Sequence, residues 1–344
     1  MKKSIKTVSV ILFIIAIFLG IKSLVKTSVG KLDTYLSINL RLNKLLNPKS
    51  IDNKSIKQIR EALNTQSIIW SKKPIPFSNI KNVTVSENSK KISIRIYTPN
   101  SNNKLPIVIY SHGGFWIGGD LDTHDAVCRK LSQNSKAIVI SVGYHLAPEN
   151  PFPIAVDDVY TILNWTYKNA ESINGDKNHI AVAGDSAGGN LSTVVSLMSR
   201  DKNGPPITCQ VLIYPSTNIF ELNSNSWSQF SNTINLSIND MEKYISLYIP
   251  KKEDRKSTYA SPLLSKDLKK LPDTLIITAE VDPLRDEGEA YGNKLKEAGN
   301  NVTITEYKGV SHGFITMDKI TSKADGAINQ ISLYLQKEFK ITKP

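Results

Sequence analysis

Residues 180–188 read Ile-Ala-Val-Ala-Gly-Asp-Ser-Ala-Gly, an apolar run that ends in a Gly-x-Ser-x-Gly pentapeptide. The run predicts a buried strand, and the apolar residues within 191–198 predict a helix directly after the pentapeptide. A strand, a tight turn and a helix in this order expose the hydroxyl of Ser186 above a sheet. The two glycines are needed because side chains at their positions would clash with the neighbouring strand and helix. The stretch therefore predicts an α/β fold with Ser186 as a nucleophile.

Apolar strands and amphipathic helices alternate along the rest of the chain. The predicted strands cover 106–110, 137–142, 180–183, 210–214, 274–279 and 302–307, and the predicted helices cover 125–131, 191–198, 290–298, 324–339 and a segment that begins at Pro153. This alternation is typical of a parallel sheet with helices on both faces. Two earlier strands, around 83–85 and 92–96, have no helix between them and are expected to form an antiparallel edge.

A glycine-rich loop, His-Gly-Gly-Phe-Trp at 112–116, follows the predicted strand at 106–110. It lies ahead of the pentapeptide, where a fold of this kind carries its oxyanion loop. Acyl transfer creates a negatively charged oxygen, and backbone N–H groups fixed around that oxygen stabilise its charge. We expect Gly113 and Gly114 to supply two of these donors, and Ala187, the residue after the serine, to supply a third.

An acid and a histidine follow the serine in the order that suits this fold. Asp282 and His312 each come just after a predicted strand, where the active sites of open α/β sheets gather. His312 would accept the serine proton, and Asp282 would fix the histidine tautomer and stabilise the imidazolium. Glu280 and Asp286 are alternatives for the acid. Glu280 alternates to the wrong side of the strand end, however, and Asp286 suits the start of the next helix.

The composition restricts the class of partner. The chain has 344 residues, a net charge of +12 and two cysteines. The lysines are spread along the chain without an arginine-rich strip, which favours a basic solvated surface suited to anionic surroundings and argues against a nucleic-acid-binding protein. Cys128 and Cys209 fit no metal-binding spacing and are predicted to be separate buried thiols. A single disulfide is the alternative if the chain is exported.

The N-terminus predicts membrane targeting. Three lysines within residues 1–6 precede an almost wholly apolar run at 8–21, VSVILFIIAIFLGI. A soluble domain rarely begins in this way, and the run is typical of a secretory signal or a membrane anchor. We expect an uncleaved anchor that leaves the catalytic domain outside the cytoplasm. Cleavage near residues 28–30 with secretion, or a peripheral or buried helix, are the alternatives, since the run is short for a full span.

The chain divides into three parts. Residues 1–30 form the targeting segment, and residues 31–77 carry apolar side chains at helical spacing that predict two or three helices. Residues 78–344 hold the alternating strands and helices. Within them, the polar stretch 218–260 interrupts the alternation and contains a helical piece at 241–248. An insertion of this kind is typical of a lid, and we expect it to form a cap together with the N-terminal helices.

Together these motifs resemble those of the hormone-sensitive lipase-like esterases, which include bacterial carboxylesterases and arylacetamide deacetylase. The matching segments are SHGGFWIGGDLDTHD (111–125), YHLAPENPFPIAVDD (144–158), GDSAGGN (184–190), ASPLL (260–264), AEVDPLRDEGEAY (279–291) and SHGF (311–314). The resemblance implies an α/β-hydrolase fold with an eight-stranded, mostly parallel sheet and a helical cap. It also implies serine-dependent hydrolysis of carboxylic esters without a cofactor or a metal ion.

Two residues depart from the family pattern. Phe115 stands where the family usually has a third glycine, so its side chain must fit the oxyanion loop and would narrow the acyl pocket. We expect Phe115 and Trp116 to contact the substrate and to favour short to medium acyl chains. His145 replaces the usual arginine before Leu-Ala-Pro-Glu, in a segment expected to be structural. His112 and Asp185 are expected to support the oxyanion loop and the turn at the serine.

Other functions are compatible with the same residues. A deacetylase, an amidase or a thioesterase would use the same nucleophile, histidine and acid on another bond. A catalytically silent ligand-binding protein is the non-enzyme alternative, because a fold alone does not determine function. Relatives that have lost catalysis typically lack the histidine, whereas His312 is present here. The sequence therefore favours an enzyme that acts on a small-molecule ester.

Overall fold

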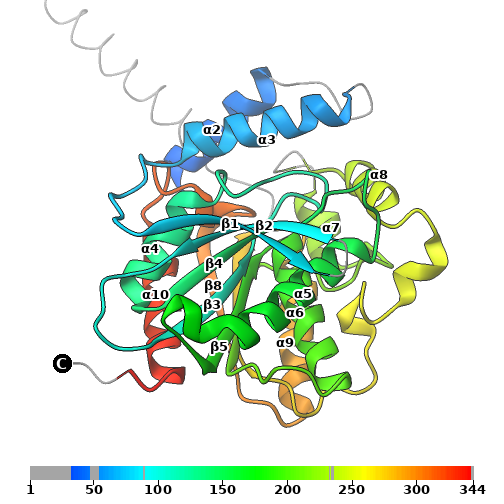
Figure 1. The fold of residues 1–344 in the computed structure, drawn as a ribbon. Coiled ribbons are helices and arrows are strands. Elements are labelled where there is room, and N and C mark those ends of the chain that lie inside the picture. Colours follow the sequence, from blue (N-terminus) through cyan, green and yellow to red (C-terminus); the bar gives the residue numbers. More distant parts are fainter. Residues whose placement is uncertain (1–31, 47–53, 88–89, 232, 234–235, 342–344) are drawn as a thin grey trace, which may run out of the picture.

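The computed structural model describes residues 32–341 apart from 47–53, 88–89, 232 and 234–235. The strands are β1 Ile80–Glu87, β2 Lys90–Tyr97, β3 Leu105–Ser111, β4 Ile138–Gly143, β5 Gly175–Asp185, β6 Cys209–Ile213, β7 Asp273–Val281 and β8 Val302–Ser311. They form one eight-stranded sheet in the order β1-β2-β4-β3-β5-β6-β7-β8 (Figure 1). The pairs from β4 to β8 are parallel, whereas β1 pairs antiparallel with β2 and β2 with β4. The predicted parallel sheet with an antiparallel edge is confirmed.

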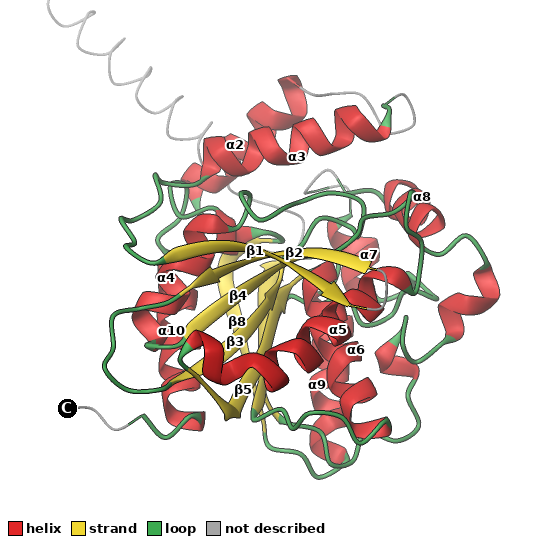
Figure 2. Ribbon diagram, in the orientation of Figure 1, coloured by secondary structure: helices red, strands yellow, loops and turns green. Residues whose placement is uncertain are grey.

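Helices cover both faces of the sheet. They are α2 Thr34–Leu46, α3 Ile56–Trp70, α4 Asp125–Ser135, α5 Ile154–Asn169, α6 Ala187–Asp201, α7 Asn225–Phe230, α8 Ile238–Tyr248, α9 Arg285–Glu297 and α10 Lys323–Glu338. Figure 2 shows α4 and α10 on one side of the strands and α5, α6 and α9 on the other side. The buried side chains divide in the same way, since those of α4 and α10 share one core and those of α5 and α6 share another.

The central strand β3 shows how the two faces are filled. Ile107 and Ile109 belong to the core beside α5 and α6, while Val108 and Tyr110 belong to the core beside α4 and α10. All four side chains are fully buried. A strand that is buried on both faces needs apolar residues at successive positions, which explains why this segment is a continuous apolar run in the sequence.

The N-terminal helix α3 lies against loops at the carboxyl ends of the strands. It begins with a capping box, in which the Ser55 hydroxyl accepts from the Gln58 N–H and the Gln58 side chain accepts from the Ser55 N–H. Further along the helix, Arg60 donates to the carbonyl oxygens of Ile117 and Ala147 at 2.7 and 3.0 Å. These carbonyls belong to the loops that follow β3 and β4. The helix therefore covers the edge of the sheet at which the predicted site lies.

The insertion between β6 and β7 contains α7 and α8. Asn190, which is fully buried in α6, holds both ends of this insertion. Its side-chain amide donates to the carbonyl oxygens of Ser216 and Ala260, each at 2.9 Å. Because α6 begins at the predicted nucleophile, one side chain links the nucleophile helix to both ends of the insertion.

Two predictions bear on whether the chain is exported: the state of the two cysteines and the apolar N-terminal run. The structure describes only the cysteines. Cys128 and Cys209 are both buried and free, so the prediction of two separate buried thiols is confirmed. The apolar run at residues 8–21 lies outside the described residues. Among the residues that are described, no helix has both the length and the apolar character needed to cross a membrane.

Candidate active site

Ser186 lies in a sharp turn between β5 and α6. Its backbone has φ 55° and ψ −117°, a conformation that L-residues rarely adopt, and it occupies the N-cap position of α6. A Cβ on Gly188 would overlap the carbonyl oxygen of Ser111 in β3, and a Cβ on Gly184 would overlap the carbonyl oxygen of Gly188. Close packing of the turn against its neighbours therefore requires both glycines of the pentapeptide.

The structure brings the predicted serine, histidine and acid into contact. His312 Nε2 lies 2.9 Å from Ser186 Oγ, and His312 Nδ1 lies 2.8 Å from Asp282 Oδ2. A carboxylate only accepts hydrogen bonds, so Nδ1 carries the proton and Nε2 is left to accept from the serine hydroxyl. Asp282 is fully buried, and its second oxygen accepts the N–H of Leu284 at 2.8 Å. This geometry is that of a serine nucleophile with an oriented general base.

Opposing effects set the pKa of His312. Burial lowers the pKa, while the charge of Asp282 and its hydrogen bond raise it, with smaller contributions from Asp185 and Glu287. The net pKa lies above the usual value of 6.5. The surrounding carboxylates therefore stabilise the protonated form of His312, which is the form that would arise if the histidine took a proton from the serine.

The two alternative acids have other partners. Glu280 Oε2 accepts the backbone N–H of Gly309 at 2.7 Å. Asp286 Oδ2 accepts the N–H of Ser226, the second residue of α7, at 2.8 Å. Of the three candidates, Asp282 is the one that contacts the histidine.

Asp185 supports the loop beside the nucleophile. Its Oδ1 atom accepts the backbone N–H of Gly113 at 3.0 Å and the hydroxyl of Tyr110 at 2.9 Å, and it lies 3.1 Å from Nε2 of His124. Burial raises the pKa of this carboxyl, whereas His124 and the hydrogen bond from Tyr110 lower it. The lowering effects together outweigh burial, so the net pKa lies below its usual value. An ionised Asp185 therefore holds the start of the oxyanion loop.

The contact between Gly113 and Asp185 corrects one prediction. A backbone N–H carries a single hydrogen, and that of Gly113 already donates to Asp185. Gly113 is therefore a supporting residue, and the prediction that it supplies an oxyanion donor is wrong. The N–H groups of Gly114, Phe115 and Ala187 make no hydrogen bond to the described part of the chain. These three groups are the donors available near Ser186.

His112 has the structural role that the sequence suggests. Its Nδ1 atom lies 2.9 Å from the carbonyl oxygen of Gly113, and its ring stacks on that of Tyr144 with centroids 4.3 Å apart. Burial lowers the pKa of His112 to about 4, so the ring stays neutral near pH 7. The Tyr144 hydroxyl in turn donates to the carbonyl oxygen of His112 at 2.7 Å.

Phe115 and Trp116 both pack against the helix α8. The Phe115 ring stacks on Tyr244 with centroids 4.4 Å apart, and the Trp116 ring stacks on Tyr248 at 4.7 Å. Phe115 remains half-buried, whereas Trp116 is only 1% exposed. This burial leaves Trp116 almost no accessible surface for a ligand, which contradicts the prediction that it contacts the substrate. Phe115 keeps a partly exposed side chain.

Glu287 is a polar residue of the site region that the sequence did not single out. This fully buried carboxylate, in the first turn of α9, accepts the backbone N–H groups of Thr217 and Asn218 at 2.8 and 3.2 Å and the indole N–H of Trp227 at 3.2 Å. Burial raises the pKa of Glu287 to about 7. The residue joins the helix that follows the candidate acid Asp282 to the start of the cap insertion. The only feature of the sequence that could have pointed to Glu287 is its position in the segment 279–291, which also contains Asp282.

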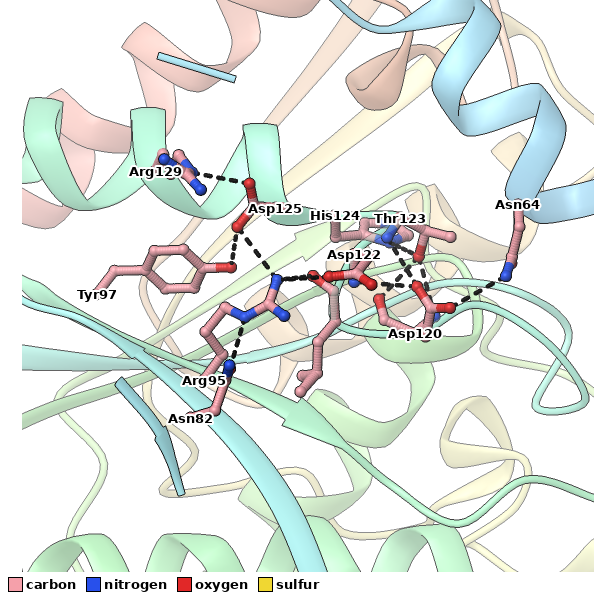
Figure 3. A network of polar contacts seen from close by, with 11 residues as sticks. Asn64, Asn82, Arg95, Tyr97, Asp120, Asp122, Thr123, His124, Asp125 and Arg129 are labelled. Atoms are coloured by element: carbon pink, nitrogen blue, oxygen red, sulfur yellow. Dashed lines mark hydrogen bonds and ion pairs between the residues drawn. The ribbon is translucent and has the colours of Figure 1, made fainter. Parts of the chain in front are cut away.

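A polar network connects α3 to the carboxylate beside the nucleophile, and Figure 3 shows most of its members. Asn64 of α3 donates to Asp120 at 3.1 Å, and Asp120 accepts the backbone N–H of Thr123 at 2.8 Å. The Thr123 hydroxyl lies 3.0 Å from Nδ1 of His124, which contacts Asp185 through its other nitrogen. The N-terminal helix is therefore linked to the oxyanion loop by a chain of polar contacts, in addition to its apolar packing against the same loop.

Arg95 of β2 holds the same segment from the side of the sheet (Figure 3). It contacts Asp122 at 2.8 Å and Asp125 at 3.3 Å, and it donates to Asn82 at 2.8 Å. Arg95 is therefore the counter-ion of Asp122, and it shares Asp125 with Arg129, which lies 2.8 Å from that carboxylate. Within the described residues, no group of histidine, cysteine, aspartate and glutamate side chains could hold a metal ion.

Several curated proteins with a similar sequence are named as esterases. A family model described as an alpha/beta hydrolase fold matches residues 108–316. Carboxylesterase NlhH of Mycobacterium tuberculosis is 39% identical over 237 residues, which are 68% of this chain and 74% of the relative. An arylesterase of Saccharolobus solfataricus is 38% identical over 241 residues, which are 70% of this chain and 78% of the relative.

Solved structures of esterases have the same fold. The esterase of Pyrobaculum calidifontis matches with a TM-score of 0.81 and 37% identity over 87% of this chain and 97% of the other. The ester hydrolase EH1AB1 from the metagenome of Lake Arreo matches with a TM-score of 0.86 and 33% identity over 90% of this chain and 99% of the other. The family model, the relatives and the geometry around Ser186 agree. The chain belongs to the hormone-sensitive lipase-like family of α/β-hydrolases and is a carboxylic ester hydrolase.

Proposed function

We propose that the chain hydrolyses carboxylic esters with short to medium acyl chains through an acyl-enzyme formed on Ser186. The observation that carries this proposal is the continuous contact from Ser186 Oγ through His312 to the buried Asp282. The backbone strain at Ser186 supports it, because strained residues of this kind cluster at active sites.

The reaction follows from the available groups. His312 Nε2 takes the serine proton while Oγ attacks the ester carbonyl. The resulting oxyanion would accept hydrogen bonds from the free N–H groups of Gly114, Phe115 and Ala187. The protonated His312 then gives its proton to the leaving alcohol. It next activates a water molecule that releases the acid and restores the serine hydroxyl.

The preference for short to medium acyl chains rests on Phe115. Its partly exposed ring lies next to a proposed oxyanion donor, and its other face is held against Tyr244 of the cap. A phenyl ring in place of a glycine hydrogen removes space that a long acyl chain would need. We therefore expect nitrophenyl butyrate to be hydrolysed faster than nitrophenyl laurate, and F115G to reduce that difference.

A fluorophosphonate probe tests the assignment of the nucleophile. The parent chain should be labelled and the S186A variant should not, since the probe reacts with an activated serine. Equal labelling of the two would refute the assignment. Nitrophenyl esters compared with the matching anilides, and with thioesters of the same acyl group, separate an esterase from an amidase or a thioesterase. An unlabelled and inactive parent would favour a catalytically silent ligand-binding protein.

We also propose that the chain is anchored in a membrane with its catalytic domain outside the cytoplasm. The support is the apolar run at residues 8–21 behind its lysines. The helices α2 and α3, which follow it, carry exposed apolar side chains, of which Ile68 is the most exposed at 76%. Cell fractionation of the full chain and of a chain without residues 1–30 tests the anchor. Recovery of the full chain in the soluble fraction would contradict it, and secretion of a shortened chain would support cleavage instead.

A further inference from the structure

The oxyanion loop has an unusual backbone. Gly114, Phe115 and Trp116 have φ values of 128°, 59° and 61°, so three consecutive residues lie in the left-handed region. Glycine adopts such values without steric cost, whereas Phe and Trp do so only when the surroundings compensate. Something outside the local sequence must therefore hold Phe115 and Trp116 in place.

The loop cannot relax at Gly114. The carbonyl oxygen of Gly114 accepts the N–H groups of Ile117 and Gly118 at 3.1 and 2.9 Å, which closes a tight turn. A Cβ on Gly114 would overlap the carbonyl oxygen of Gly118. The turn therefore requires glycine at 114, and the two aromatic residues that follow it keep positive φ values within the same turn.

Backbone hydrogen bonds hold the loop on either side of Phe115. The N–H of Gly113 donates to Asp185, the carbonyl of Trp116 accepts from Ala147 at 3.0 Å, and the carbonyl of Ile117 accepts from Arg60. The backbone of Phe115 makes no hydrogen bond to the described part of the chain. At this residue the loop depends on contacts of the side chain.

The ring-stacking contacts of Phe115 and Trp116 come from a single helix of the cap. Tyr244 and Tyr248 lie four residues apart on α8 and so face the same side of the helix. Tyr244 stacks on Phe115 with an interplanar angle of 22°, and Tyr248 stacks on Trp116 with an angle of 2°. The Trp116 indole N–H and the Tyr248 hydroxyl find no hydrogen-bond partner among the described residues. The rings themselves therefore make the contact.

We propose that Tyr244 and Tyr248 are positioning residues that hold the oxyanion loop in its left-handed conformation, so that docking of α8 sets the catalytic rate. This inference rests on the proposed function, in which the N–H groups of Gly114 and Phe115 receive the oxyanion. Donors that are fixed in advance stabilise the transition state, whereas donors that must first be ordered do so less well. Loss of a stacking ring lets Phe115 leave the left-handed region and turns its N–H away from Ser186.

The experiment is a double-mutant cycle between the cap and the loop. In the parent, Y244A should lower kcat by about ten-fold and change KM less. This loss is smaller than the loss in kcat that follows complete removal of an oxyanion donor, because the donor is displaced and not deleted. Y244F restores the ring and should recover the lost kcat. In the F115G background, Y244A should lower kcat by less than about two-fold relative to F115G, because glycine keeps a φ of 59° without a stacking partner.

The alternative roles of Tyr244 give different results. If it acts by touching the substrate or by general stabilisation of the cap, Y244A costs the same factor with Phe115 and with Gly at 115, which would overturn the inference. An unchanged kcat in Y244A would also overturn it. Should Y244A not fold, Y244L keeps apolar bulk without a planar ring, and the same comparison applies. I238A changes a partly exposed residue in the first turn of α8 and controls for weakening of the helix.

Failure of this inference can be told apart from failure of the proposed function. Fluorophosphonate labelling of Ser186 in the parent reports on the nucleophile alone. A parent that is not labelled removes the proposed function and the inference with it. A labelled, active parent in which Tyr244 and Phe115 act independently removes only the role of α8.

Discussion

At the residue scale, the ionisation of His312 controls the proposed reaction. Its imidazole accepts the serine proton only when it is neutral. Burial lowers its pKa, but Asp282 outweighs that effect and the pKa lies above 6.5. The value of kcat/KM should therefore fall as the pH drops through this raised pKa.

Asp282 can be tested by removing its charge while keeping its shape. D282N should lower kcat by about four orders of magnitude, because the histidine loses its oriented tautomer. The acid limb of the kcat/KM profile should also move to lower pH, since the charge that raises the pKa of His312 is gone. D286N is the matched control, because Asp286 accepts from Ser226 and not from the histidine. Equal losses in the two variants would contradict the assignment of the acid.

Glu287 links pH to stability. Burial raises its pKa from 4.5 to about 7, so the folded state binds this proton more tightly than the unfolded state. The stabilisation is complete below pH 4.5 and is lost as the pH rises through 7. Between these limits the free energy of unfolding of the parent should fall, relative to that of E287Q, by about 2–3 kcal/mol.

Urea unfolding of the parent and of E287Q at acidic and at mildly alkaline pH measures this difference. E289Q removes the same charge from a half-buried position on the same helix and should show a smaller pH dependence. Parallel pH curves for the parent and E287Q would show that Glu287 ionises near its unfolded pKa. In that case the desolvation of Glu287 is matched by its three N–H donors.

At the element scale, the cap insertion depends on Asn190. This one side chain in α6 donates to buried carbonyls at both ends of the insertion, Ser216 and Ala260. N190A leaves both carbonyls without that partner and should lower the free energy of unfolding by about 2–4 kcal/mol. Urea unfolding measures the loss. N164A removes one hydrogen bond, from the Asn164 side-chain amide to the carbonyl oxygen of Tyr160 within α5. It should lower the free energy of unfolding by about 1 kcal/mol or less. A cost for N190A no larger than that of N164A would contradict the role of Asn190.

The cap also connects elements that are distant in sequence. Glu287 joins α9 to the start of the insertion, and Tyr244 and Tyr248 join α8 to the oxyanion loop. Arg60 of α3 reaches the same loop from the N-terminal side. The proposed nucleophile, acid and oxyanion donors are therefore each connected to a part of the cap, so a movement of the cap would shift the positions of all three groups.

At the scale of the whole molecule, the net charge of +12 should govern binding to surfaces. A chain without residues 1–30 keeps a net positive charge and should still bind anionic vesicles better than neutral ones. The difference should disappear at about 1 M salt, where the Debye length is about 3 Å. Vesicle sedimentation at low and high salt measures it. Binding that is insensitive to lipid charge would show that apolar contacts dominate.

Much of the fold and the triad could be predicted because the signals are local. The alternating apolar runs reflect strands buried on both faces, as β3 shows with Ile107 and Val108 in opposite cores. The turn at Ser186 needs glycines for steric reasons that act within a few residues. Asp282 and His312 follow predicted strands, and parallel strands bring their carboxyl ends to the same edge.

The sequence alone determined the chemistry of this protein: a serine, a histidine and an acid in the order and setting of an ester hydrolase. Only the tertiary structure decided which groups near the serine are free to act. Gly113 is occupied by Asp185, 72 residues away, and Trp116 is buried under Tyr248. The physical reason is that a backbone N–H donates one hydrogen and a ring face is covered by the group that packs on it. Which group becomes the partner depends on proximity in the folded chain and not on neighbours in the sequence. The sequence therefore identifies the residues of the oxyanion loop, and the packing of the cap against them determines the conformation of the loop.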